Sequence, residues 1–296
     1  NGKPVPFVNI LLNGYYYGTS TNLEGRFELK IRPDQVQKNN HLKISCIGYE
    51  NQLIALQTIN LEHYQQIQLK RSSNALGEFV VKGTKLRKKE ENQAKKLVQS
   101  ALDRIPKNKA KGHYTADSFY RHYCKEDSSY VRLVEAALSF YQEKSNKSFS
   151  QIPEERLNFH LAQLRRSFDF TAFAKLEHPP ISLNFLLSND LMNYEFRNPL
   201  RSAFNRLKFT IKDTTQFNNE AVVLVDFISE NTEHSTRSYS GMLYITLKDK
   251  AFVRADIQEA QTEVTSYDST YSVVEKKIFY QRIDRHYYPN RVISDV

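Results

Sequence analysis

Two carboxylates are the residues of this chain best suited to acid–base chemistry, because each lies inside an apolar, strand-like segment. Glu135 stands within Leu133–Phe140, and Asp226 stands within Ala221–Ile228. A carboxyl group buried in such a segment is more easily protonated and can act as a general acid. The simpler interpretation is that each carboxylate faces solvent or pairs with a cation, because one face of an antiparallel strand is commonly polar. We favour the simpler interpretation.

The nearest approach to a metal-ligand cluster is formed by His113, His122 and Cys124. If this segment is a strand, His122 and Cys124 share one face, as two zinc ligands would. No histidine has the His-x-x-Glu spacing of zinc carboxypeptidases, and none lies in a His-Glu-x-x-His helix. We therefore expect no metal and no cofactor. The histidines are interpreted as surface or structural residues: His41, His63, His113, His122, His160, His178, His234 and His286.

Other catalytic signatures are missing from the sequence. It contains no Gly-x-Ser-x-Gly elbow, no phosphate-binding loop and no dinucleotide fingerprint. Cys46 and Cys124 both lie in strand-like segments, and we favour two separate buried thiols over a disulfide. The run Tyr15–Tyr17 suits a binding platform for sugar or peptide, but a strand with tyrosine on both faces explains it more simply. We therefore predict a protein that is not an enzyme.

The charge of the chain limits the kinds of partner. Its formal net charge is +9, which suits either an anionic partner or a generally basic surface. Lys and Arg are spread along the chain and no nucleic-acid-binding motif is present, so we expect no nucleic acid. The longest apolar run, Ala221–Ile228, is far too short for a transmembrane helix. Because the sequence starts at Asn1, we expect it to be trimmed at one or both ends.

The elements that would position these residues begin with a β-rich region over residues 1–82. Single glycines separate short segments with strand composition. Phe27, Leu29 and Ile31 alternate with charged residues, which indicates one buried and one solvated face. A turn at Asn22–Gly25 would join two of the strands in a hairpin. Short strands at this density indicate a β-sandwich; the segments are Val5–Leu12, Tyr15–Thr19, Arg26–Ile31, His41–Ile47, Leu53–Leu56, Gln65–Leu69 and Phe79–Val81.

Residues 83–106 have the periodicity of an amphipathic helix that links two domains. Pro106 is expected to end it. Its first turns are basic, which suits an anion-binding or membrane-surface patch, although a solvated linker helix is the interpretation we favour. The apolar stripe consists of Ala94, Leu97, Val98, Ala101, Leu102 and Ile105, and the basic run of Lys85, Arg87, Lys88, Lys89, Lys95 and Lys96.

Residues 107–296 are predicted to form an α+β domain with an antiparallel sheet. Tyr114–Cys124 has the pattern of a strand. Tyr130–Tyr141 suits a strand or a helix, and we favour the strand. The middle is expected to be helical, with Leu157, Leu161, Leu164 and Phe168 on one face and an apolar turn over Ile181–Met192. A meander follows, with strands at Leu207–Ile211, Ala221–Ser229, Ser240–Leu247, Phe252–Gln258 and Ser272–Ile283, and an extended segment before Val296.

The glycine-rich pattern of residues 1–82 resembles the carboxypeptidase-regulatory-like domain, a transthyretin-like sandwich common in cell-envelope proteins of Bacteroidota. The resemblance implies an Ig-like fold and a place in the cell envelope, and it brings no peptidase with it. The residues that carry it are Pro4, Val8, Ile10, Gly14, Gly18, Thr19, Thr21, Gly25, Phe27, Leu29, Ile47, Gly48, Tyr49 and Glu50.

Two further segments resemble parts of envelope proteins. Ala75–Gly83 is similar to the junction between this domain and the plug of TonB-dependent transporters. The hairpin Tyr239–Ile245 to Ala251–Asp256 is similar to the hairpins of the LolA-like lipoprotein carriers. In that fold a curved antiparallel sheet wraps around helices and can enclose acyl chains.

Together these observations predict a fold that is mainly β, with an N-terminal sandwich, a linking helix and a curved C-terminal sheet with helices. The function we expect is docking, as an accessory subunit of an outer-membrane or periplasmic assembly for transport, protein export or insertion. Its partner would be a protein of the periplasm or outer-membrane surface of a Gram-negative bacterium. The alternative is a carrier for a lipid or lipoprotein acyl chain, and the least favoured option is a hydrolase that uses Glu135 or Asp226.

Overall fold

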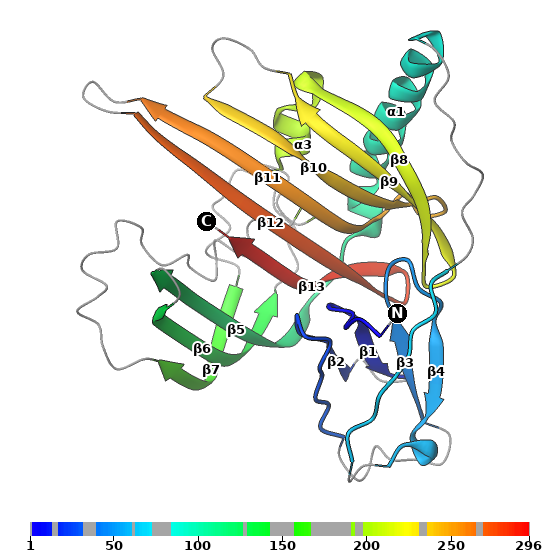
Figure 1. The fold of residues 1–296 in the computed structure, drawn as a ribbon, viewed down its shortest axis with the longest axis vertical. Helices are drawn as coiled ribbons and strands as arrows, with labels where there is room; N and C mark the ends of the chain where they lie inside the picture. The colour runs from blue at the N-terminus through cyan, green and yellow to red at the C-terminus, as the bar shows by residue number, and fades with distance from the viewer. Residues whose placement is uncertain are drawn as a thin grey trace. The chain divides into compact units, whose positions relative to one another are not determined.

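The computed structural model describes residues 2–13, 17–31, 40–60, 63–72, 84–126, 129–142, 157–166, 191–192, 198–230, 236–264 and 269–295 (Figure 1). The chain divides into two compact units, and neither is one continuous stretch of sequence. Unit 1 consists of Asn1–Arg104 and Lys208–Glu259, and unit 2 of Ile105–Leu207 and Ala260–Val296. Among the described helices, none has the length and apolar character needed to cross a membrane.

The N-terminal part of unit 1 is built on a four-stranded antiparallel sheet. Its strands are β1 (Asn9–Leu12), β2 (Tyr17–Ser20), β3 (His41–Ser45) and β4 (Gln52–Ala55), in the order β2-β1-β3-β4. A single 3-10 turn, η2 (Leu56–Thr58), follows β4. One face of the sheet supplies a compact apolar core of Val8, Ile10, Leu12, Leu42, Ile44 and Leu56.

Two extended segments cover this core without joining a ladder. Arg26–Ile31 was expected to be a hairpin strand, and Gln65–Leu69 another strand; both expectations are wrong, because neither segment is a strand. The predicted alternation in Arg26–Ile31 is nevertheless present, since Phe27, Leu29 and Ile31 pack against the core. Ile67 and Leu69 do the same. The sheet and these segments therefore enclose the core from two sides, as expected of a sandwich.

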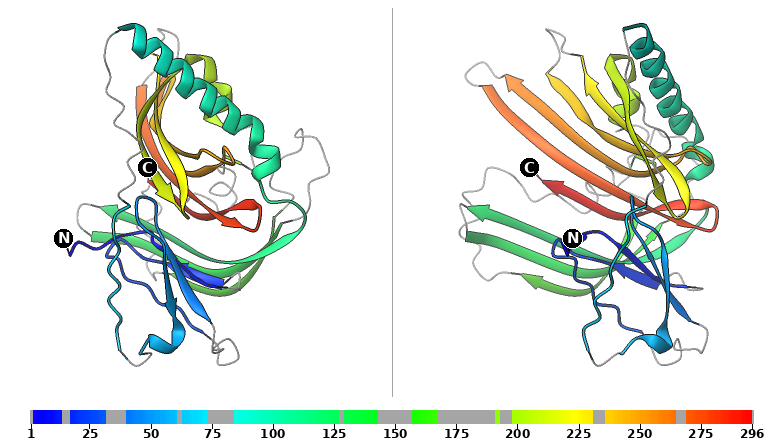
Figure 2. Two further views of the ribbon diagram at one scale, coloured as in Figure 1. Left: turned by 90° about the vertical axis from the view of Figure 1, so that its right-hand side faces the viewer. Right: turned by 45° about the vertical axis from the view of Figure 1, so that its right-hand side comes forward.

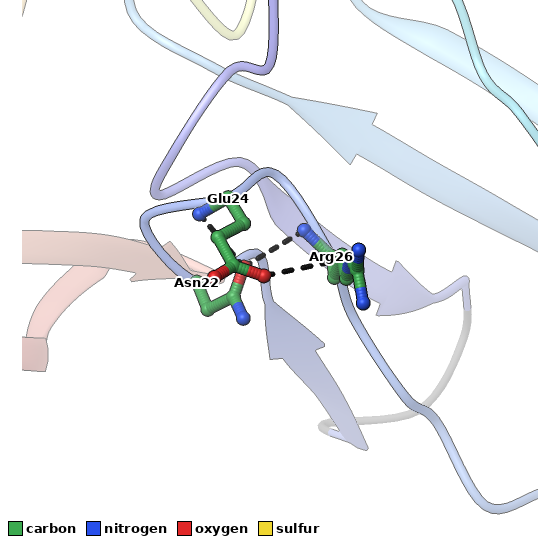
Figure 3. A network of polar contacts seen from close by, with 3 residues as sticks. All are labelled: Asn22, Glu24 and Arg26. Carbon is green, nitrogen blue, oxygen red and sulfur yellow. Dashed lines mark hydrogen bonds and ion pairs between the residues drawn. The ribbon is translucent and has the colours of Figure 1, made fainter.

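The predicted turn at Asn22–Gly25 is present and is held by one side chain (Figure 3). The Oδ1 atom of Asn22 accepts hydrogen bonds from the backbone amides of Glu24, at 3.0 Å, and Arg26, at 2.9 Å. Asparagine commonly stabilises turns in this way. The Glu24 carboxylate also lies 3.5 Å from the guanidinium of Arg26. The preceding Thr21 is buried, and its hydroxyl joins the carbonyl of Val5 to the amide of Val8.

The second part of unit 1 is a run of long strands that confirms the predicted meander. It comprises β8 (Leu207–Phe217), β9 (Glu220–Ser229), β10 (Arg237–Thr246) and β11 (Phe252–Val264), hydrogen-bonded in chain order. In β9 and β10, Val223, Val225 and Phe227 alternate with more exposed residues and oppose Ile245, Leu243 and Gly241. Period-two alternation of this kind buries one face of the sheet.

Helix α1 (Thr84–Asn108) runs along one face of these strands (Figure 2). The predicted apolar stripe is confirmed, because Ala94, Val98, Ala101 and Leu102 are all buried. Charge also relates α1 to β8. The pKa of Lys208 is raised mainly by Glu230, to which it is bound at 2.9 Å, and to a smaller extent by Glu91 of α1.

Pro106 does not end α1 as predicted. The helix continues to Asn108, and the amide of Lys109 still donates to the carbonyl of Ile105 at 2.9 Å. A proline removes one N–H donor and excludes the α conformation chiefly from the residue before it. In a last turn this loss is tolerated, so the expected end was wrong by two residues.

Unit 2 contains a three-stranded sheet formed by β5 (Tyr114–Glu126), β6 (Ser129–Gln142) and β7 (Leu157–Arg166), in that order. The preference for a strand at Tyr130–Tyr141 is confirmed. The helix expected at Leu157–Phe168 is wrong, because Leu157–Arg166 is strand β7. The four-residue spacing of its leucines suggested a helix, whereas the alternation of Leu157, Phe159 and Leu161 specifies a strand.

The remainder of unit 2 includes a hairpin of β12 (Ser269–Ile283) and β13 (His286–Asp295), with the short helix α3 (Pro199–Ser202) and the 3-10 turn η6 (Phe204–Arg206). Of the apolar turn expected at Ile181–Met192, only the last two residues lie within the described part. Both are buried, and the Leu191 amide donates to the hydroxyl oxygen of Tyr280 at 3.0 Å. The segment before β7 and most of that turn lie outside the described residues.

Gly241 provides a test of the strand packing in unit 1. A Cβ atom added there would lie 2.0 Å from the backbone carbonyl oxygen of Asp256 on β11. Because that oxygen belongs to a neighbouring backbone, Gly241→Ala should lower the free energy of unfolding by about 3 kcal/mol. The control is Gly112→Ala, where φ is +83° but nothing lies within 4 Å; strain alone predicts a loss of about 1 kcal/mol. Equal losses in urea unfolding would contradict this account.

Candidate functional site

The three-stranded sheet of unit 2 holds Glu135 between two arginines. The strand register places Arg121 of β5 opposite Glu135 of β6, and places Arg165 of β7 opposite it on the other side. One carboxylate oxygen lies 2.7 Å from the Arg121 guanidinium, and the other lies 3.6 Å from that of Arg165. The Glu135 side chain is 12% exposed. Glu135 is therefore the shared acceptor of an ion-pair network, which matches the simpler of our two interpretations.

Asp226, the second candidate acid, lies in unit 1 on β9. Its side chain is 37% exposed, and one carboxylate oxygen lies 3.6 Å from the amine of Lys212 on β8. This is an ordinary surface ion pair, which contributes little to stability. The structure thus places the two carboxylates in different units, each beside a cation.

The histidine and cysteine candidates are brought together only in part. His122 and Cys124 share one face of β5 as predicted, and the Cys124 sulfur lies 3.4 Å from Nε2 of His122. His113 instead stacks on Tyr141, and its Nδ1 atom lies 2.8 Å from the Tyr141 hydroxyl. Within the described residues, no three His, Cys, Asp or Glu side chains gather as a metal site would require. His178 and His234 lie outside those residues.

The outer face of this sheet, which carries Glu135, also carries exposed aromatic rings. Phe119 and Tyr123 of β5 are both largely exposed, and the Arg121 guanidinium carbon lies 5.4 Å from the centre of the Phe119 ring. The Ser139 hydroxyl donates to the Asp117 carboxylate across β5 and β6. Aromatic residues and arginine are enriched at protein–protein contacts. This outer face, defined by Phe119, Arg121, Tyr123 and Glu135, therefore has the composition of a docking surface.

Strand β7 exposes apolar side chains that the sequence analysis did not identify as a site. Phe159, Leu161 and Leu164 are 37%, 53% and 50% exposed. Leu161 and Leu164 were expected on one face of a helix and Phe159 was not considered, so the exposure of all three at a sheet edge was missed. The alternation Leu157-x-Phe159-x-Leu161 was the signal that could have indicated a strand.

In unit 1, the turn after β3 binds to β8. The amide of Gly48 donates to the Gln216 carbonyl at 2.9 Å, and the Ser72 hydroxyl donates to the Gln216 side-chain oxygen at 3.0 Å. Gly48 has φ of +85°, a conformation that other residues resist. A Cβ atom there would lie 3.4 Å from the hydroxyl oxygen of Thr215. This contact joins the N-terminal sandwich to the long strands.

Near this contact, Arg254 interacts electrostatically with the Cys46 thiol. Arg254 of β11 makes two hydrogen bonds to Asp256, at 2.8 and 2.6 Å, and lies over the ring of Tyr244 at 4.9 Å. Burial raises the pKa of the Cys46 thiol to about 11, and the charge of Arg254 opposes that rise. Cys46 and Cys124 are both free thiols, as favoured, and each is partly buried, whereas full burial was expected.

The comparisons with known proteins identify the first part of this arrangement. The sequence matches the family described as the CarboxypepD_reg-like domain over residues 1–81. Residues 1–81 form a CarboxypepD_reg-like domain. Searches of curated proteins and of solved structures found no match. The CarboxypepD_reg-like domain thus includes β1–β4, the Asn22 turn and the Gly48 turn that binds β8. Of the Tyr15–Tyr17 run, only Tyr17 is described, and its hydroxyl donates to the carbonyl of Lys30.

The ion-pair network predicts different effects of neutralising the two carboxylates. Glu135→Gln removes the charge of a largely buried acceptor and weakens its hydrogen bond to Arg121, so it should lower the free energy of unfolding by about 1 kcal/mol. Asp226→Asn, the matched control, removes an exposed pair and should cost less than about 0.5 kcal/mol. Urea unfolding of both variants gives the comparison. A smaller loss for Glu135→Gln than for Asp226→Asn would contradict the proposed role of the network.

The Cys46 thiol should react slowly with alkylating reagents in the folded protein. With a pKa of about 11, roughly one thiol in a thousand is ionised at pH 8. In a Cys124→Ser background, the rate of iodoacetamide reaction should rise with pH toward about 11. Arg254→Met should slow it further, because the opposing charge is removed. A rate curve centred near 9.0, the pKa of the thiol in the unfolded chain, would refute the burial argument.

The same raised pKa fixes how stability depends on pH. Below the unfolded value of 9.0 the thiol is protonated in both states and contributes no pH dependence. Between about 9 and about 11 the unfolded chain loses the proton first, so the Cys46 contribution to the free energy of unfolding falls as pH rises.

Proposed function

We propose that this protein is a non-enzymatic docking or accessory subunit of a cell-envelope assembly, at the outer membrane or in the periplasm of a Gram-negative bacterium. The assembly would serve transport, protein export or insertion. The observation that carries the proposal is the outer face of the three-stranded sheet, where Phe119 and Tyr123 are exposed beside Arg121. Large aromatic rings and arginine at the centre of a contact supply most of its binding energy.

The CarboxypepD_reg-like domain supports the proposed compartment. Domains that resemble it are abundant in envelope proteins of Bacteroidota, where they accompany larger transport proteins. In this chain the domain uses its Gly48 turn to bind β8, so it acts as a structural part of unit 1. A domain fixed in this way is suited to presenting the rest of the chain to a partner.

The proposal that the protein is not an enzyme is supported by the surroundings of the two candidate acids. Glu135 is held by Arg121 and Arg165, and Asp226 by Lys212. Both carboxylates are thus engaged in ion pairs with neighbouring cations, which is an ordinary structural role for an acidic side chain on a sheet. The hydrolase option therefore remains the least favoured.

The alternative function, a lipid carrier, is supported by the long antiparallel strands with α1 along one face. This protein shares that general feature with LolA-like proteins. A carrier also needs an apolar pocket of several hundred Å³. The core of unit 1 is tightly packed where that pocket would be expected: Val98 and Leu102 of α1, with Phe209 and Phe227 of the strands, are at most 1% exposed. This packing favours docking over acyl-chain binding.

A native pull-down tests the docking role. Tagged protein captured from mildly solubilised envelopes should bring down a stoichiometric envelope protein, identified by mass spectrometry. Phe119→Ser should reduce that recovery at least about fivefold, because an exposed aromatic anchor is lost. Tyr64→Ser removes an even more exposed ring from unit 1 and should leave recovery unchanged. Repeated recovery of a lone monomer, or equal loss in both variants, would argue against the proposal.

A further inference from the structure

Strand β7 is an open edge of its sheet. On one side it pairs with β6, and among the described residues no strand pairs with the other side. An open edge leaves backbone N–H and C=O groups available to another chain. Proteins commonly protect such edges with proline or lysine: β13 has Pro289, and β8 has Lys208 and Lys212. The sequence of β7, LNFHLAQLRR, contains neither residue type.

The apolar face of β7 continues the core of the sheet. Phe159 lies opposite Phe140, with ring centres 6.4 Å apart, and Leu161 lies opposite Leu138. Phe140 and Leu138 are buried, whereas Leu161 is half exposed. The core therefore stops at β7 with apolar surface still in contact with water. One more strand with apolar residues at alternate positions would cover it.

The charge of β7 determines which strand fits. β7 ends in Arg165 and Arg166 and contains no acidic residue. On the outer face, within the part of the sheet that the structure describes, the guanidinium groups of Arg121 and Arg165 share one carboxylate, that of Glu135, so positive charge exceeds negative charge in this network. Both pairings in the sheet are antiparallel. A strand added in the same sense would place its N-terminal residues beside Arg165 and Arg166.

We propose that β7 binds an extended segment of the partner protein by antiparallel strand addition. That segment carries carboxylates at its N-terminal end and apolar residues at alternate positions after them. The inference rests on the proposed docking function and names the chemistry of the partner at this edge. Main-chain hydrogen bonds would supply affinity, while the apolar and acidic side chains would supply register and specificity.

A synthetic peptide tests the inference directly. The probe is a fluorescein-labelled decapeptide that begins with Asp-Glu and continues with alternating Val and Thr, and binding to the full chain is followed by fluorescence anisotropy. The matched peptide begins with Lys-Arg. We expect the acidic peptide to bind about tenfold more tightly, the effect of two exposed ion pairs at the upper end of their range. Equal binding of the two peptides, or binding of neither, would overturn the inference.

Paired substitutions locate the binding. Leu161→Lys places a charge on the apolar face of the edge and should weaken binding of the acidic peptide at least about tenfold. Leu53→Lys is the control, because Leu53 is 62% exposed on β4, an edge strand of the four-stranded sheet, and should leave affinity within about twofold. Circular dichroism and urea unfolding establish that both variants are folded. An unchanged affinity in Leu161→Lys would refute β7 as the site.

The pull-down separates this inference from the proposed function. If Leu161→Lys recovers the envelope partner as well as the wild type does, docking stands and the β7 inference fails. If the wild type recovers no partner while the peptide results hold, the edge binds strands but the proposed function fails.

Discussion

The contact between Gly48 and Gln216 is the constraint on which unit 1 depends. A single turn of the CarboxypepD_reg-like domain donates its amide to the backbone of β8, and Ser72 binds the side chain of the same glutamine. The left-handed backbone of Gly48 lets the turn approach Thr215 closely. In the sequence, the N-terminal sandwich and the long strands are separated by α1 and by residues 105–207 of unit 2. With the contact between Gly48 and Gln216, they form one compact unit.

The charged groups near this contact are paired with close neighbours. Arg254 has its charge satisfied by Asp256 and its flat face covered by Tyr244, so it can lie near the Cys46 thiol at small cost. Unit 2 uses the same principle at Glu135, where a largely buried carboxylate is held by cations from both neighbouring strands. In unit 1 the partner of Arg254 lies two residues away on the same strand, whereas in unit 2 strand register supplies the partners of Glu135.

The sequence allowed the strands of the meander, the stripe of α1 and the core positions of the N-terminal sandwich to be predicted, because each follows a local period. It did not allow β7 to be predicted, since leucines four apart suggested a helix more strongly than the alternation suggested a strand. Arg26–Ile31 shows the opposite case, in which alternating burial exists without a ladder. Local sequence patterns could not identify the partners of Glu135, because these are set by the register of β5, β6 and β7. The outer face with Phe119 and Arg121, and the position of β7 at the edge of its sheet, depend on that same register.

Unit 1 is built from two distant stretches of sequence, so its two parts are synthesised at different times. The Ser72–Gln216 bond joins residues 144 apart, and Asn51 reaches Asn219 across 168. Contacts between such distant segments form late and slow the folding of a chain. The ribosome synthesises the CarboxypepD_reg-like domain long before β8. Until β8 is synthesised, the Gly48 turn has no strand to bind. The incomplete chain therefore has to be kept from pairing with other segments or other proteins.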